Sequence, residues 1–188
     1  AASVLAAGMS LIGGVVGLVL VLSGDLLALV EQQRTHDPLT GLLNRQGLRH
    51  WVASQSAEEP VALGMVDLDH FKQINDLHGH AMGDQVIRHL ATLLQACGSE
   101  HCRAARLGGE EFVVVALGSG RGPDLRQMLE RLRQQFADTA PQPGATLSAG
   151  LALGSVGEFE ATLREADAAL YRAKQAGRNR VEAAFSAI

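Results

Sequence analysis

The sequence predicts an α+β fold with a split βαββαβ core, in which helices flank a central, mainly antiparallel sheet. Two observations lead to this prediction. Short apolar runs typical of strands alternate with longer segments whose apolar residues recur at helical spacing. Two of these strands are joined by a short glycine-containing turn, as neighbouring antiparallel strands are. A hydrophobic helix is expected to precede this core at the N-terminus.

The N-terminal segment, residues 1–24, carries no charged side chain and is rich in Leu, Val, Ile and Gly. A helix that spans a bilayer needs roughly 20 apolar residues. Glycines are costly in a soluble helix but common in membrane helices. We therefore expect a transmembrane helix, the end of a larger membrane region, in preference to a buried helix of a soluble domain. Arg34, Arg45 and Arg49 follow it, which favours a cytoplasmic location for the C-terminal side.

A short connecting segment, residues 25–36, follows the apolar run. Leu26, Leu29 and Val30 give it a brief apolar stripe, which indicates a linker or signalling helix. Pro38 is expected to end this helix. A separate domain is therefore predicted over residues 37–188.

The first half of this domain is expected to contain a strand, a helix and a hairpin. Residues 61–69 form an apolar run that ends in acidic residues, which predicts a central strand. Residues 70–98 place their apolar side chains on one face, which predicts a helix. Residues 102–117 predict a strand, a tight turn and a second strand.

The second half repeats this alternation. Residues 124–137 predict an amphipathic helix, and residues 145–154 predict a strand. Residues 159–177 predict a helix that ends at Gly177. Residues 180–185 predict a last short strand. The order of these elements contains the ferredoxin-like βαββαβ arrangement.

The composition limits the classes of partner. The chain is not basic, because it has 16 Lys and Arg residues, 20 Asp and Glu residues and a net charge of -4. A broad nucleic-acid groove is therefore not expected. The spacing of Cys97 and Cys102 matches no zinc motif, so we expect both to be reduced thiols.

Two aspartates close the predicted central strand, where ligands often bind. Alternation along the strand sends Asp67 and Asp69 to one face and Leu68 to the other. The helix that begins near His70 offers unpaired backbone N–H groups suited to phosphate. Asp69 has an alternative role, which is to cap that helix.

The turn of the predicted hairpin contains two glycines and two glutamates in succession. Gly108 and Gly109 allow a tight turn and a close approach to a bulky ligand. The topology should bring Glu110 near Asp67, and two converging carboxylates repel unless a cation lies between them. Their oxygens suit Mg²⁺. The alternative is a solvated hairpin tip in which Glu110 and Glu111 are merely exposed.

A basic pair follows on the last helix. Lys174 and Arg178 are four residues apart, which places them on one face of a helix. They could neutralise the oxygens of a triphosphate, for which Arg is well suited. The alternative is a basic turn that complements the helix dipole.

Four motifs together carry a resemblance to a known family. They are "DPLTGLLNR", "VDLDHFKQINDLHGHAMGD", "RLGGEEF" and "YRAKQAGRNRV", and they span about residues 37–185. In this order and at these separations they resemble the GGDEF family of diguanylate cyclases. The resemblance implies a palm-like nucleotidyl cyclase domain that condenses two GTP into cyclic di-GMP with release of two pyrophosphates.

The resemblance also implies cofactors, partners and a location. It implies Mg²⁺ or Mn²⁺, two ions per active site, and a two-fold homodimer in which each domain holds one GTP. With the N-terminal helix, it implies a protein of the bacterial inner membrane with its catalytic domain in the cytoplasm.

The resemblance assigns roles to particular residues. The implied metal ligands are Asp67, the carbonyl oxygen of Leu68, and Glu110. The implied catalytic residues are Asp67, Glu110 as proton acceptor from the ribose 3′-hydroxyl, and Lys72 as a stabiliser of phosphate charge. The implied substrate-binding residues are Asn75 and Asp84 as readers of guanine, with Phe71, His80, Gly108, Gly109, Lys174 and Arg178.

The sequence departs from the family pattern in two places. The signature reads GGEEF in place of GGDEF, which keeps the carboxylate and which the family accepts. The RxxD motif that binds inhibitory product in many members is replaced by Ser99, Glu100, His101 and Cys102. We therefore expect no product inhibition through that site. Two alternatives remain: a catalytically silent module that binds GTP or cyclic di-GMP, and a cyclase that makes a different nucleotide product.

Overall fold

The computed structural model describes residues 34–96, 98–99 and 101–184. The transmembrane helix predicted over residues 1–24 and nearly all of the linker predicted over residues 25–36 lie outside the described residues. None of the helices within the described ranges is both long enough and apolar enough to cross a membrane.

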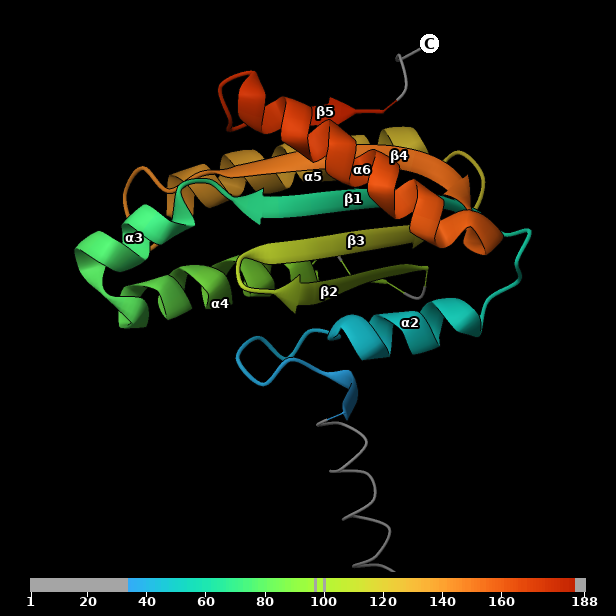
Figure 1. Ribbon diagram of the computed structural model, residues 1–188, viewed down its shortest axis with the longest axis horizontal. Helices are drawn as coiled ribbons and strands as arrows, with labels where there is room; N and C mark the ends of the chain where they lie inside the picture. Colours follow the sequence, from blue (N-terminus) through green and yellow to red (C-terminus); the bar gives the residue numbers. More distant parts are fainter. Residues whose placement is uncertain (1–33, 97, 100, 185–188) are drawn as a thin grey trace, which may run out of the picture.

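Strands and helices are interspersed along the described chain (Figure 1). The strands are β1 (Pro60–Leu68), β2 (Cys102–Gly108), β3 (Glu111–Leu117), β4 (Leu147–Ser155) and β5 (Val181–Ala183). The helices are α2 (Arg45–Ala53), α3 (Phe71–His78), α4 (His80–Ala96), α5 (Arg121–Thr139) and α6 (Phe159–Gln175), with a short 3₁₀ turn, η1 (Val156–Glu158), before α6.

The five strands form one sheet in the order β2-β3-β1-β4-β5. All neighbours are antiparallel except β4 and β5, which are parallel. The α+β class and the mainly antiparallel sheet flanked by helices are thereby confirmed. The first four strands have the order of a ferredoxin-like core, with β1 in the middle between β3 and β4. The end of β1 is consequently the point where side chains from both neighbouring strands can converge.

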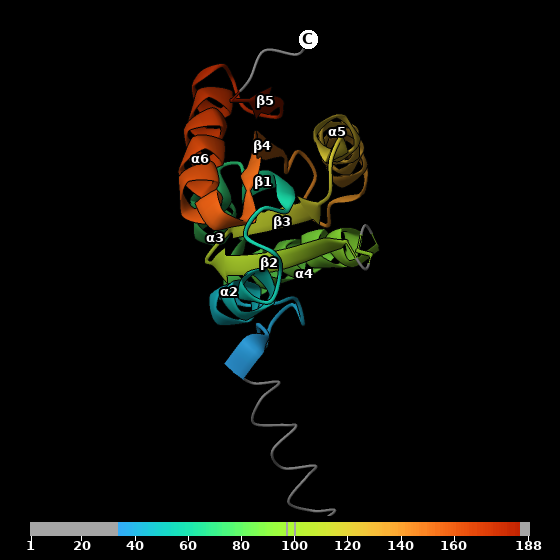
Figure 2. The ribbon, with the colours of Figure 1, turned by 90° about the vertical axis from the view of Figure 1, so that its right-hand side faces the viewer.

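Helices cover both faces of the sheet (Figure 2). Leu68 and Val66 of β1 belong to the core packed with α3, α4 and α5. Leu63 and Met65 belong to the core packed with α2 and α6. Because side chains alternate along a strand, Asp67 points to the face covered by α6. A carboxylate thus occupies the last position on this face of an otherwise apolar strand.

The structure differs from the predicted elements in two places. The helix predicted over residues 70–98 is two helices, α3 and α4, separated at Gly79, whose φ of 79° lies outside the helical region. The sequence prediction also missed α2. The side chain of Asn44 caps this helix by accepting a hydrogen bond from the N–H of Gly47 at 2.9 Å.

Candidate active site

Asp67 lies at the centre of the candidate site. Its side chain is only 8% exposed, and Oδ1 is 2.8 Å from Nζ of Lys174 on α6. Burial raises the pKa of Asp67 to about 6 from an ordinary 3.8. The hydrogen bond and charge of Lys174 oppose this rise in the pKa, and the charges of Glu110 and Glu111 add to it. The chain therefore keeps a carboxylate in a place that favours its neutral form.

The hairpin turn lies beside Asp67, as the sequence predicts. Gly109 and Glu110 form the loop between β2 and β3, and Glu111 is the register partner of Asp67. Sequence reasoning gave Glu110 the main role, whereas the register brings Glu111 directly opposite Asp67. Gly108 and Gly109 have φ values of 145° and 52°, which favour glycine. A Cβ built at either glycine would meet no atom within 4 Å, so the turn borders open space.

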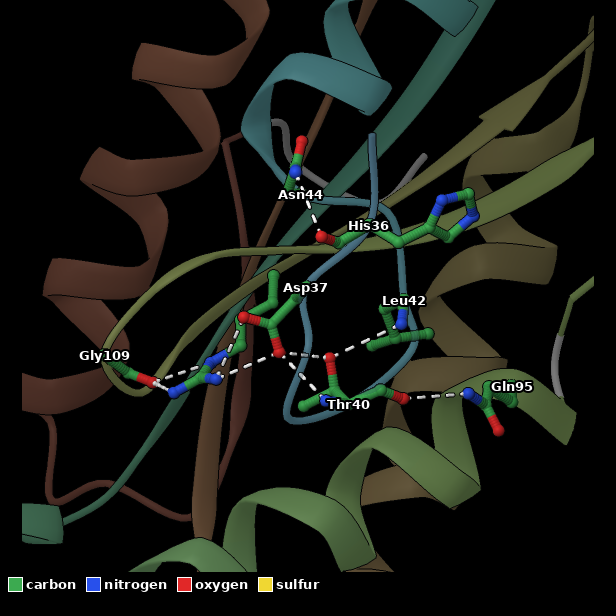
Figure 3. A network of polar contacts seen from close by, with 8 residues as sticks. His36, Asp37, Thr40, Leu42, Asn44, Gln95 and Gly109 are labelled. Carbon is green, nitrogen blue, oxygen red and sulfur yellow. Dashed lines mark hydrogen bonds and ion pairs between the residues drawn. The ribbon is translucent and has the colours of Figure 1, made fainter. Parts of the chain in front are cut away.

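An ion-paired arginine anchors this turn. Figure 3 shows Asp37, Thr40 and Gly109 of the polar network around it. Arg106 donates two hydrogen bonds to the carbonyl of Gly109, at 2.7 and 3.0 Å, and its Nη1 is 3.0 Å from Oδ1 of Asp37. Thr40 donates to the same carboxylate through its hydroxyl and its N–H. Burial acts to raise the pKa of Asp37, but the contacts with Thr40 and Arg106 lower it below its ordinary value. The sequence analysis missed this anchor, although both residues lie in the quoted motifs.

Asp69 anchors a second loop. It accepts hydrogen bonds from the hydroxyls of Thr146 and Ser148, at 2.8 and 2.7 Å, and from the N–H of Asn179 at 3.0 Å. The alternative of Asp69 as a helix cap is wrong, because no side chain caps α3 and the preceding position is His70 in a left-handed conformation. Asp69 instead ties the segment after α6 to the end of β1.

The basic pair is arranged differently from the predicted helical face. Lys174 lies in the last turn of α6, but the helix ends at Gln175 and Arg178 follows it with a φ of 61°. The N–H of Arg178 donates to the carbonyl of Ala173 at 3.0 Å. The prediction that Lys174 and Arg178 lie on one face of a helix is therefore wrong. Arg178 is carried by the loop that Asp69 holds, so both basic residues still lie near the end of β1.

The predicted guanine readers lie on two adjacent helices. Asn75 is on α3, Asp84 is on α4, and both are half-buried. Gly83 lets the helices approach, because a Cβ there would lie 2.0 Å from Oδ1 of Asn75 and 3.1 Å from Cζ of Phe71. The ring of Phe71 is buried in the core, so its contribution is to position α3. The sequence analysis did not single out Gly83.

The remaining predicted residues have simple placements. Lys72 on α3 and His80 at the start of α4 are exposed. The side chain of Leu68 is buried in the core, so only its backbone could face a ligand.

The residues present fit a divalent cation by their chemistry. Asp67 and Glu110 supply the carboxylate oxygens that Mg²⁺ prefers. A cation would relieve the repulsion that Glu110 and Glu111 exert on the buried Asp67 carboxylate. The described residues contain no ready-made group of three or more His, Cys, Asp or Glu side chains that could hold a metal. Further oxygens must therefore come from backbone, water or a ligand.

The fold and the site together define the class. A mainly antiparallel α+β sheet carries a buried aspartate at the end of its central strand, beside a glycine hairpin with two glutamates and a lysine. These features define a domain whose acidic site suits a divalent cation and a phosphorylated ligand. The chain belongs to the GGDEF family: residues 34–180 match the family described as "Diguanylate cyclase, GGDEF domain".

Curated relatives and solved structures agree with this assignment. The chain is 40% identical over 155 residues to an uncharacterized signaling protein of Caulobacter vibrioides and 41% identical over 170 residues to the diguanylate cyclase DgcP of Pseudomonas aeruginosa. These matches cover 76% and 82% of the chain but only 19% and 24% of the relatives. The chain thus spans about a quarter or less of these two proteins.

Two solved structures are similar over most of the chain. The coiled coil and GGDEF domain of DgcB from Caulobacter crescentus, in complex with cyclic di-GMP, has a TM-score of 0.80 and 30% identity, covering 88% of this chain and 94% of that one. The active GGEEF domain of a diguanylate cyclase from Vibrio cholerae has a TM-score of 0.61 and 34% identity, covering 75% and 90%. Both are at least 30% identical to this chain, so the similarity extends from the fold to the sequence.

Proposed function

We propose that this chain is a diguanylate cyclase that condenses two GTP into cyclic di-GMP and two pyrophosphates. The observation that carries the proposal is the placement of the intact glycine–glutamate turn beside the buried Asp67, with Lys174 in contact with the same carboxylate. Membership of the GGDEF family supports the choice of substrate and product.

In the proposed reaction a ribose hydroxyl is the nucleophile, a carboxylate accepts its proton, and pyrophosphate is the leaving group. The ribose 3′-hydroxyl of one GTP attacks the α-phosphorus of the other, Glu110 accepts the hydroxyl proton, and pyrophosphate leaves. A second, symmetric attack closes the ring. Lys174, Arg178 and Lys72 would neutralise phosphate charge, because phosphoryl transfer depends mainly on positioning and electrostatic stabilisation. Asn75 and Asp84 would hold the guanine edge by hydrogen bonds.

A divalent cation belongs to this proposal. Asp67, Glu110 and the carbonyl of Leu68 would hold Mg²⁺ or Mn²⁺, two ions per site. When bound, such ions neutralise the triphosphate and favour ionisation of the attacking hydroxyl. The charges of Glu110 and Glu111, which act on the buried Asp67 carboxylate, support a site built for a cation.

The assembly and the location are further parts of the proposal. One domain positions one GTP, and both new bonds are equivalent, so two copies related by two-fold symmetry would face each other. Residues 1–24 would anchor the protein in the bacterial inner membrane with the catalytic domain in the cytoplasm. Product would not inhibit through an RxxD site, since Ser99 and Cys102 stand at its charged positions.

Two alternatives compete with this function. A silent module would bind GTP or cyclic di-GMP without turnover, but the glycines and glutamates of the turn are all present. A cyclase for another nucleotide would need a different base reader, whereas Asn75 and Asp84 suit guanine.

The test is to incubate the purified chain with GTP and Mg²⁺ and to identify the product by mass. We expect cyclic di-GMP from the wild type and none from Glu110→Gln. The matched control is Glu165→Gln, which removes an exposed carboxylate on α6 far along the helix from Lys174 and should keep the wild-type rate. Wild-type turnover by Glu110→Gln would refute the role of Glu110 as proton acceptor.

A further inference from the structure

We infer that Lys174 holds the place of the divalent cation in the nucleotide-free protein, so that the metal enters together with the triphosphate. This inference rests on the proposed function, which brings a metal and a triphosphate to Asp67. It adds an order of binding and a second role for Lys174.

The first observation is the contact itself. Nζ of Lys174 lies 2.8 Å from Oδ1 of Asp67, which is the distance of a charge-assisted hydrogen bond. The carboxylate side chain is 8% exposed, whereas the lysine side chain is 33% exposed. The buried partner therefore depends on the contact, while the lysine can leave for solvent or for another anion at a lower cost.

The second observation is the surrounding charge. The carboxylates of Glu110 and Glu111 both act on Asp67. In the part of the chain that the structure describes, Lys174 is the basic side chain that forms an ion pair with Asp67. Two further carboxylates thus lie within electrostatic range of the buried Asp67 carboxylate, and one ammonium group balances its charge. A cation is needed at this position, and the protein supplies its own.

The third observation is the incomplete metal site. Within the described residues, no group of three or more metal-binding side chains is gathered. Mg²⁺ is reluctant to lose its water and usually binds through one or two carboxylates together with substrate phosphates. A free ion would have to compete with Lys174 for Asp67 and would gain few other ligands. A metal that arrives on a triphosphate brings phosphate oxygens with it.

The same triphosphate gives Lys174 a new partner. A lysine carries a compact charge on a flexible four-carbon stem, so it can turn from one anion to another without movement of its helix. The backbone beneath it is fixed, because the neighbouring Ala173 is fully buried. We therefore place the exchange in the side chain: from Asp67 in the empty site to phosphate oxygens in the loaded one.

The experiment measures Mn²⁺ binding to the full chain by electron paramagnetic resonance, in mildly alkaline buffer, with and without a non-reactive GTP analogue. Without nucleotide, Lys174→Met should bind Mn²⁺ about tenfold more tightly than wild type. This gain in affinity lies between the effect of losing a surface ion pair and that of losing a buried one. Arg172→Met is the matched control. Arg172 lies two residues away and donates to the carbonyl of Ala183, so nucleotide-free affinity should not change.

The outcomes separate this inference from the proposed function. If wild type gains no tight Mn²⁺ site when the analogue is added, the proposed function fails. If wild type gains that site but Lys174→Met binds free Mn²⁺ no better than wild type, Lys174 does not hold the place of the cation and the inference is wrong. Should the methionine variant fold poorly, Lys174→Gln removes the charge alone and should show the same gain. Lys174→Arg keeps the charge and should bind free Mn²⁺ as weakly as wild type.

Discussion

Replacing Asp67 with Asn should stabilise the folded protein above about pH 6 while abolishing cyclase activity. The folded-state pKa of about 6 lies above the ordinary 3.8, so the folded protein binds this proton more tightly than the unfolded chain does. The stability of the wild type therefore falls as pH rises from about 4 to about 6, and the loss persists at higher pH. Asn resembles the protonated carboxyl and avoids the loss.

The size of the effect follows from the shift in pKa. A rise of about two units corresponds to about 3 kcal/mol of unfolding free energy at neutral pH. The assay is urea denaturation of wild type and Asp67→Asn across the acid range, with product analysis alongside. The two curves should converge below about pH 4, where the wild-type carboxyl is protonated in both states. A variant that is less stable than wild type at neutral pH would refute the reasoning.

Three further predictions concern the site and its control. Gly83→Ala should raise the KM for GTP about five- to tenfold with little change in melting temperature, because the new Cβ displaces the far end of the Asn75 side chain. Arg106→Gln should lower kcat and cost about 1–3 kcal/mol of stability, because the half-buried Asp37 loses its ion-pair partner and the Gly109 carbonyl loses its donor. Steady-state kinetics and urea denaturation check the two effects. Added cyclic di-GMP should leave initial rates nearly unchanged, and strong non-competitive inhibition would contradict the expected lack of product feedback.

The hairpin could be predicted from the sequence because local signals agree there. Two glycines stand between apolar strands, and such turns join antiparallel neighbours. The register could not be predicted to one residue. Placing the two-residue loop at Gly109 and Glu110 pairs Glu111 with Asp67, whereas a shift by one position would pair another residue.

The break between α3 and α4 illustrates a second limit. Apolar spacing continues across residues 70–98, and one glycine inside a helical pattern is often tolerated. At Gly79 the backbone leaves the helical region, and Gly83 then packs against Asn75. This close approach of two helices depends on tertiary packing, which a pattern of apolar residues does not encode.

The role of Asp69 shows why long-range partners escape sequence reasoning. Its hydrogen-bond donors Thr146 and Asn179 lie 77 and 110 positions away along the chain. Helix capping is a local rule and therefore was the natural alternative for an aspartate before a helix. The fold instead uses this carboxylate to fix the loop that carries Arg178.

The most direct test of the central claim is the stoichiometry of turnover. Purified chain, Mg²⁺ and GTP should yield cyclic di-GMP with two pyrophosphates per product molecule, and ATP in place of GTP should yield no cyclic dinucleotide. Tight binding of GTP with no pyrophosphate release, or release that accompanies a different nucleotide product, would contradict the account.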